Sequence, residues 1–272
     1  MKKLQYKRNP WSHKGDFGYV LIVGGNIWYS GSPVFNAIPA LRVGADIATV
    51  IAPKRSADIV ASFAPDLIAY PLAGNYLRYS HVNEILKISK NYDSLIIGGG
   101  LGVNFQTKRA VHKILRKLKL PMVIDADAIK TLDGNLSIIK NKNVILTPNA
   151  AEFEKITKQS LKDEVKDRSQ KAKDFAKQYN VVVILKGNID IITDGKRTFE
   201  NKSGSVYMTK GGFGDTLAGI AGSLLAQGYE PLEAARMAAD INGKAGELAV
   251  KKYGRGVIAS DIFETIPQIV KK

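Results

Sequence analysis

The stretch Gly211-Gly212-Phe213-Gly214-Asp215 leads into an apolar helical pattern that covers residues 216–226. Glycines at the start of a helix leave backbone N–H groups exposed, and the positive end of the helix dipole lies at the same point. These groups can bind a phosphoryl group or a developing negative charge. Asp215 would stand in the first turn, where its carboxylate repels anions. We therefore interpret it as a general base that takes a proton from a hydroxyl group, although Asp also caps helices without further function.

The composition limits which chemistry can accompany this motif. The chain has 272 residues, 45% of them hydrophobic and 24% charged, as in an ordinary globular protein. The absence of cysteine excludes disulfides, thiolate zinc sites and cysteine nucleophiles. With only His13, His81 and His112, a site built from several histidines is not expected. A metal in this protein would be a hard cation held by oxygen atoms, and magnesium fits best.

The formal net charge of +15 raises the question of nucleic-acid binding. The lysines gather on helical surfaces such as 113–119 and 155–177, and in the second of these they alternate with acidic residues. Aromatic residues are not interleaved with them in a way that would stack bases. We therefore expect a solvated lysine-rich surface and no nucleic-acid partner, with a positive field that still attracts a phosphate-rich small molecule.

The sequence also bears on membranes and location. No apolar run is long enough to cross a bilayer, and the basic start of the chain, residues 1–8, is not followed by an apolar signal segment. We expect a cytoplasmic protein without a membrane partner.

Short apolar runs alternate with helical patterns along the whole chain. Strands are expected at 19–23, 47–51, 67–70, 94–97, 122–124, 144–146, 181–185, 190–193 and 197–200, the last two flanking the hairpin signal Asp194-Gly195. Helices are expected at 33–43, 56–63, 82–89, 107–118, 150–156, 162–179, 215–227, 231–251 and 260–270. Neither a linker nor an internal repeat interrupts this order, so we expect one domain over residues 1–272.

Most of these strands are continuous apolar runs, which indicates burial on both faces. The fold class is therefore α/β, a mostly parallel sheet with helices on both faces. Ligands bind at the carboxyl edge of such sheets. Glycine, polar or ionisable residues follow five of the strands, which predicts an active site at this edge: Gly24-Gly25-Asn26, Gly98-Gly99-Gly100-Leu101-Gly102, Asp125-Ala126-Asp127, Thr147-Pro148-Asn149 and Lys186-Gly187.

Further residues at this edge have two interpretations each. Asn149 and Glu152 lie on one side of a first helical turn, where they could hold hydrated magnesium, but their spacing alone favours a capping box. Lys186 and the glycine after it could approach a nucleotide phosphate, or Lys186 could be a surface lysine. Asp125 and Asp127 leave their strand on opposite sides, so one could face the site while the other bonds loop amides, or both could be exposed loop carboxylates.

Taken together, the order and spacing of these motifs resemble a known family from residue 13 to the last helix. The chain resembles the ribokinase-like superfamily and, within it, the ADP/ATP-dependent NAD(P)H-hydrate dehydratases. Besides the motifs above, the resemblance rests on His13-Lys14-Gly15-Asp16-Phe17-Gly18, Ser30-Gly31-Ser32-Pro33, Ala40-Leu41-Arg42-Val43-Gly44-Ala45-Asp46, Leu146-Thr147-Pro148-Asn149-Ala150-Ala151-Glu152-Phe153 and the stretch 211–219. It implies a ribokinase-like three-layer sandwich.

The resemblance also implies an activity, a lyase reaction that repairs hydrated NADH or NADPH (NADHX or NADPHX). ADP or ATP, with magnesium, would phosphorylate the ring hydroxyl, and elimination of that phosphate would restore the double bond. The implied catalytic groups are Asp215 and the amides of Gly212, Phe213 and Gly214. The implied nucleotide-binding residues are Lys186, Gly187, Asn188, Ile189, Asp190 and Gly214. Those implied for the hydrated dinucleotide are Ser32, Gly102, Asn149 and Asp215, with Asn149 and Glu152 implied for magnesium.

The family further suggests a homotetramer and, in many relatives, an N-terminal domain that epimerises the hydrated cofactor. We expect no such domain in this chain, so a separate protein would epimerise the substrate. Three positions depart from the family pattern, which usually has Thr at Phe213, His at Asn149 and Pro at Gly99.

Two other functions compete with this one. A small-molecule kinase of the same fold, acting on a hydroxymethylpyrimidine, a thiazole or a sugar, would use the same base and amides and release a stable phosphorylated product. A non-catalytic nucleotide- or nucleic-acid-binding protein would use the basic surface, but it would gain nothing from a carboxylate at the anion site.

Overall fold

The computed structural model describes residues 8–271, and the basic segment 1–7 and residue 272 lie outside this range. Within it, nine strands form one sheet: β1 (Tyr19–Val23), β2 (Ile47–Pro53), β3 (Ile68–Leu72), β4 (Ser94–Ile97), β5 (Met122–Ile124), β6 (Val144–Leu146), β7 (Val182–Leu185), β8 (Asp190–Thr193) and β9 (Thr198–Asn201). The helices are α1 (Gly31–Val43), α2 (Lys54–Phe63), α3 (Val82–Ile88), α4 (Phe105–Lys117), α5 (Ala126–Thr131), α6 (Ala150–Thr157), α7 (Val165–Tyr179), α8 (Phe213–Ala226), α9 (Pro231–Tyr253) and α10 (Ile262–Val270).

The strand order is β3-β2-β1-β4-β5-β6-β7-β8-β9. Strands β1 to β7 pair in parallel, and β8 and β9 continue the sheet in antiparallel fashion. The parallel pairing places the carboxyl ends of seven strands at one edge, as the sequence predicts. The hairpin expected at Asp194-Gly195 is confirmed, with β9 beginning one residue later than expected.

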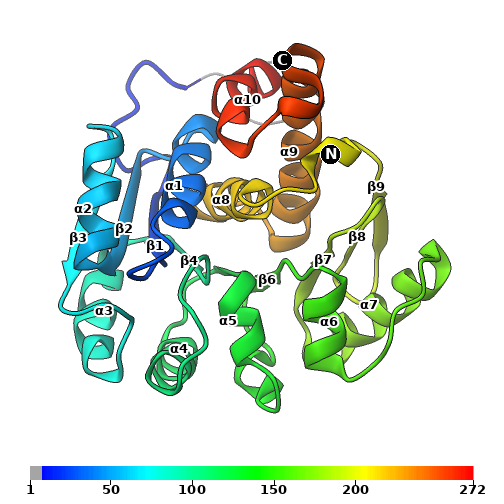
Figure 1. Cartoon of the computed structure of the whole chain (residues 1–272), viewed down its shortest axis with the longest axis horizontal. Coiled ribbons are helices and arrows are strands. Elements are labelled where there is room, and N and C mark those ends of the chain that lie inside the picture. Colours follow the sequence, from blue (N-terminus) through cyan, green and yellow to red (C-terminus); the bar gives the residue numbers. More distant parts are fainter. Residues whose placement is uncertain (1–7, 272) are drawn as a thin grey trace.

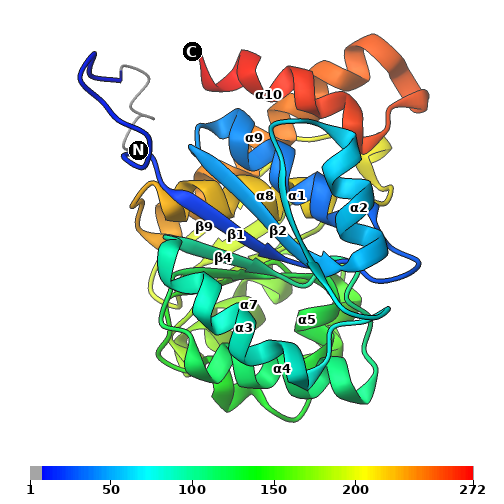
Figure 2. The ribbon, with the colours of Figure 1, turned by 90° about the vertical axis from the view of Figure 1, so that its left-hand side faces the viewer.

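Helices cover both faces of the sheet, which confirms the predicted α/β sandwich (Figure 1). Helices α1, α2, α8, α9 and α10 lie on one face, and α3 to α7 lie on the other (Figure 2). Strand β1 shows why the apolar runs are continuous. Val20 and Ile22 pack into the core on the side of α1 and α8, whereas Leu21 and Val23 pack into the core on the side of α3 and α4. The four side chains are at most 1% exposed. Burial on both faces removes the polar alternation of a surface strand.

The expected elements agree with the structure apart from their ends and one omission. No helix is expected after β5, whereas α5 begins at Ala126, two residues after the end of that strand. Six residues are too few to show a helical hydrophobic period. Helix α8 begins at Phe213, two residues before the expected start, and α7 begins at Val165 rather than at residue 162.

Helices α1 and α8 approach each other closely enough to exclude a side chain. A Cβ added to Gly219 would collide with the backbone of Asn36. The same Asn36 is buried in α1, and its side-chain amide donates to the backbone oxygen of Asp215 at 2.8 Å. The packing of the two helices therefore fixes the position of the first turn of α8.

A search of the helices within the described range finds none that is long and apolar enough to span a membrane.

The helix contact at Gly219 generates a stability prediction. We expect Gly219→Ala to lower the free energy of unfolding by about 1–3 kcal/mol, because rotamer changes cannot relieve a backbone clash. Helix propensity acts in the opposite direction, by about 1 kcal/mol, so the clash must outweigh it. Chemical denaturation measures the change. Gly256→Ala is the matched control, since an added Cβ there meets no atom within 4 Å; equal stability of both variants would contradict the close contact.

Candidate active site

The first turn of α8 presents backbone amides toward the carboxyl edge of the sheet. Gly212 caps the helix with φ 99°, a left-handed conformation that suits glycine. The first hydrogen bond of the helix runs from the Thr216 amide to the Gly212 oxygen at 2.9 Å. The amides of Phe213, Gly214 and Asp215 therefore precede the hydrogen bonds that run along the helix. The Phe213 side chain is buried in the core, so this residue can offer only its backbone to a ligand. The predicted anion site is thus available at this turn.

Asp215 lies in this first turn, held by α1 and by the glycine loop after β4. The Ser32 hydroxyl donates to Asp215 Oδ2 at 3.2 Å. A Cβ added to Gly99 would lie 2.5 Å from Asp215 Oδ1, so the absence of a side chain there makes room for the carboxylate. Ser32 and Gly99, which both lie far from Asp215 in the sequence, therefore fix the direction in which its carboxylate points.

The environment of Asp215 suits a base that works near neutral pH. Burial raises the pKa of its carboxyl to about 7, and the negative charge of Asp125 acts in the same direction. The Lys186 ammonium and the hydrogen bond from Ser32 oppose this rise. A general base whose pKa lies near the working pH is both available and effective.

Lys186 brings a positive charge next to the anion site. Its ammonium donates to Asp125 Oδ1 at 3.1 Å, and it would lie 3.1 Å from a Cβ added to Gly214. Burial disfavours the charged form of Lys186, but the charges of Asp125 and Glu152 outweigh this and raise its pKa. Lys186 is thus a charged group beneath the first turn of α8, as a phosphate-binding lysine should be.

The rest of the predicted nucleotide segment forms a tight loop after β7. The Gly187 amide donates to Asp190 Oδ1 at 3.0 Å, and Asn201 donates to Asp190 Oδ2 at 3.0 Å. Burial raises the pKa of the Asp190 carboxyl, which these hydrogen bonds oppose. Gly187 and Asn188 are exposed, and Ile189 is half-buried. Asp190 therefore closes the loop, while Gly187 and Asn188 present an accessible surface beside Lys186.

Asn149 and Glu152 form the capping box that their spacing favours. Asn149 Oδ1 accepts from the Glu152 amide at 2.8 Å, and Glu152 Oε2 accepts from the Asn149 amide at 3.0 Å. Across residues 8–271, no three His, Asp or Glu side chains converge as a metal-binding group. Direct coordination by a cage of protein side chains therefore does not fit, whereas attachment of a hydrated ion through water is compatible with Glu152 and Asn149.

The two aspartates after β5 have different contacts: one faces the site, and the other bonds a loop amide. Asp127 accepts from the Gly102 amide at 2.8 Å and pairs with Lys130 at 2.8 Å, so it orders the glycine loop. Asp125 faces the site and accepts from the Thr147 hydroxyl at 2.6 Å. Gly102, a predicted substrate contact, is therefore tied to the helix that follows β5.

Several residues that hold the site were not found by sequence reasoning. Arg168 donates to the Lys186 backbone oxygen at 2.8 Å, and it is buried although it is an arginine on the lysine-rich helix α7. Thr216 donates to Asn242 Oδ1 at 2.8 Å, which ties the first turn of α8 to α9. Asn36 and Asn242 did carry a signal, because each is a polar residue on an otherwise apolar helical face.

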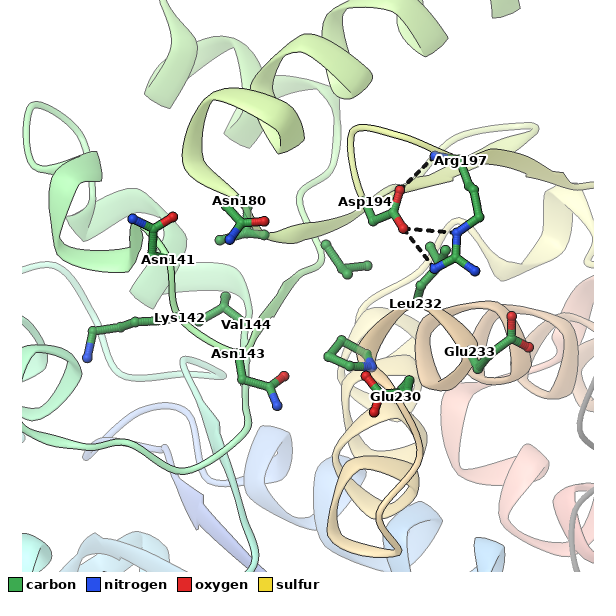
Figure 3. Close-up of a pocket in the computed structure, with 13 residues that line it drawn as sticks. Asn141, Lys142, Asn143, Val144, Asn180, Asp194, Arg197, Glu230, Leu232 and Glu233 are labelled. Atoms are coloured by element: carbon green, nitrogen blue, oxygen red, sulfur yellow. Dashed lines mark hydrogen bonds and ion pairs between the residues drawn. The ribbon is translucent and has the colours of Figure 1, made fainter.

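A cavity of about 450 Å³ lies at the opposite, amino edge of the sheet (Figure 3). It is bounded by the starts of β6 and β7, the β8–β9 turn and the start of α9, and Figure 3 shows the paired Asp194 and Arg197 at its rim. None of the predicted site residues lines it. The chemistry-bearing residues thus gather at the carboxyl edge and not at this cavity.

Comparison with known proteins gives a consistent picture. A family model described as NAD(P)H-hydrate dehydratase matches residues 20–268. The chain is 39% identical over 271 residues to the bifunctional NAD(P)H-hydrate repair enzyme Nnr of Pyrobaculum aerophilum, covering 99% of this chain and 54% of that protein. It is 35% identical over 278 residues to the ADP-dependent (S)-NAD(P)H-hydrate dehydratase of Cenarchaeum symbiosum, covering all of this chain and 94% of that protein.

Solved structures show the same fold. The crystal structure of an ADP/ATP-dependent NAD(P)H-hydrate dehydratase from Bacillus subtilis, co-crystallized with ATP/Mg²⁺, superposes with a TM-score of 0.81 at 24% identity, covering 97% of this chain and 93% of that chain. A ribokinase-like superfamily protein from Enterococcus faecalis gives a TM-score of 0.84 at 24% identity, covering 97% and 90%. The ribokinase-like fold expected from the sequence is thereby confirmed.

The surroundings of Asp215 generate a titration prediction. We expect the Asp215 carboxyl to titrate with a midpoint near pH 7 in the free protein, because burial and the Asp125 charge disfavour its ionised form. Carbon-detected NMR of the aspartate carboxyl groups measures this midpoint, and Asp215→Asn assigns the resonance. A midpoint in the ordinary aspartate range would show that water screens the carboxylate fully.

Proposed function

The chain belongs to the NAD(P)H-hydrate dehydratase family, and we propose that it converts hydrated NADH or NADPH back to the reduced cofactor, with an adenine nucleotide as phosphoryl donor. The names of its relatives support this activity. The chain spans about half the length of the bifunctional relatives, and nearly the full length of the ADP-dependent dehydratase of Cenarchaeum symbiosum.

The observation that carries the proposal is that Asp215 and the predicted anion site lie in the same turn of α8. The carboxylate lies in the same helical turn as the amides of Gly212, Phe213 and Gly214, with the Lys186 ammonium beneath that turn. A base and an anion site this close allow one group to accept a proton while the others stabilise a transferring phosphoryl group. Pure phosphate binding would gain nothing from a carboxylate at this place.

In the proposed reaction, Asp215 takes the proton from the hydroxyl group on the hydrated nicotinamide ring. The hydroxyl oxygen then bonds to the terminal phosphorus of the nucleotide. The bond from that phosphorus to the oxygen that bridges it to the rest of the nucleotide breaks, and the shortened nucleotide leaves. Phosphate is a far better leaving group than hydroxide. The ring carbon–oxygen bond breaks next, and loss of a proton from the neighbouring carbon restores the double bond.

The residues that the family resemblance implies for binding divide between the two reactants. Lys186 and the Gly187–Asn188 surface would meet the nucleotide, and Asp190 would hold that loop closed. Ser32, Gly102 and Asn149 would contact the hydrated dinucleotide. The donor is ADP by the names of the archaeal dehydratases, and ATP is the alternative that the B. subtilis structure offers.

Magnesium fits this site through water and nucleotide phosphates. Four carboxylates, those of Asp125, Asp127, Glu152 and Asp215, face two lysines, Lys130 and Lys186, which leaves an excess of negative charge. Glu152 and Asn149 would hold the hydrated ion, which would neutralise charge on the phosphates when bound. Asn149 takes the place usual for His in the family, and its amide oxygen is the hard donor that magnesium prefers.

Two further expectations belong to the proposal. The family resemblance supports a homotetramer, and the sequence favours a cytoplasmic location.

A direct assay tests the proposed function. Purified protein is incubated with NADHX, magnesium and either ADP or ATP, while recovery of the reduced-nicotinamide absorbance is followed. We expect recovery that depends on the nucleotide, which also identifies the donor. No recovery with either donor, from NADHX or NADPHX, would overturn the proposal and favour the small-molecule kinase.

The role of Asp215 makes a second prediction. We expect Asp215→Asn to lower kcat about a hundred- to ten-thousand-fold, the range that a positioned base contributes, while nucleotide affinity is kept. Steady-state kinetics and calorimetric nucleotide titration measure the two effects. Asp163→Asn, a substitution of an exposed acidic residue, is the control. Near-normal turnover of Asp215→Asn would refute the assigned base.

A further inference from the structure

Asp125 is a buried carboxylate at the site for which neither the comparisons nor the proposed chemistry gives a role. It follows β5, occupies the position directly before α5 without a side-chain hydrogen bond to that helix, and is 2% exposed. Its Oδ1 accepts both from the Thr147 hydroxyl at 2.6 Å and from the Lys186 ammonium at 3.1 Å. These contacts join the ends of β5, β6 and β7, three neighbouring strands.

Stability alone gives a poor reason for this ion pair. Removing two charges from water is costly, and an apolar pair of similar size is often as stable or more stable. The pair is therefore better explained by what it places. Within the described residues, the Lys186 ammonium makes its one hydrogen bond to Asp125, which leaves two donor protons for a ligand. Their position beside Gly214 puts them at the predicted phosphoryl site.

We propose that Asp125 is a positioning residue, which holds the Lys186 ammonium beneath the first turn of α8 and, through its buried charge, sets the electrostatic environment of Asp215. The inference rests on the proposed function, because it concerns the same base and the same anion site. Thr147 in turn orients Asp125.

The charges around Asp215 determine the sign of the effect. Asp125 and Asp127 face it from the segment after β5, Lys186 from the segment after β7, and Ser32 from α1. Asp125 repels the ionised form of Asp215 and also neutralises Lys186, which would otherwise favour that form. Removal of the Asp125 charge therefore lowers the pKa of Asp215 on both counts.

Asp125→Asn tests this role, because it keeps the shape of the side chain and removes its charge. We expect the acid limb of the kcat/KM profile to move about one pH unit lower, the size of shift that a nearby charge produces. We also expect the KM for the nucleotide to rise several-fold, because Lys186 loses its anchor. Thr147→Val is the matched control, since it disturbs the same contact and leaves every charge in place.

The outcomes separate a positioning role from a merely structural one. An acid limb that stays in place in Asp125→Asn, or that moves equally in Thr147→Val, would overturn the proposal. If Asp125→Asn does not fold, Asp125→Ser carries the same test, because it leaves room for water beside Lys186. NMR titration of Asp215 gives a readout without turnover. A lower midpoint in Asp125→Asn supports the inference even if the wild-type protein fails to process NADHX, and an unchanged midpoint contradicts it.

Discussion

The parallel pairing of β1 to β7 is the constraint on which the rest of the structure depends. It places seven strand ends at one edge and leaves the loops after them to meet there. These loops approach one another through their backbones where a side chain would not fit, as at Gly24, whose added Cβ would lie 2.7 Å from the Gly99 backbone oxygen. Helix α8, packed against α1 through Gly219, brings its first turn to the same edge. The site follows from how the sheet is ordered.

Negative charge is in excess at this edge of the sheet. Asp125, Asp127, Glu152 and Asp215 outnumber the two lysines beside them, Lys130 and Lys186, so the free site is short of positive charge. A proton on Asp215 or a hydrated cation can offset this excess of negative charge. The basic surface of the protein separately attracts an anionic nucleotide toward the site. Burial, together with the negative charge of Asp125, raises the pKa of Asp215 to about 7, so this base is ionised only near neutral pH and above.

Much of this arrangement could be predicted from the sequence, because its signals are local. Continuous apolar runs predicted the parallel sheet, and the Asn149–Glu152 spacing predicted the capping box that the structure shows. The pairing of Asp125 with Lys186 could not be predicted, since 61 residues separate them and only the strand order brings them together. The contact of Gly99 with Asp215 was equally hidden. Helix α5 was not predicted because it is shorter than two helical turns.

The central claim is that the ring hydroxyl becomes a phosphate ester at Asp215 before it leaves. The most direct measurement uses NADHX that carries a heavy-oxygen label in that hydroxyl group, with unlabelled nucleotide and water. Mass spectrometry then follows the label during turnover. We expect it in inorganic phosphate, in an amount equal to the NADH formed. Label released into water, or a stable phosphorylated substrate without NADH formation, would contradict the mechanism.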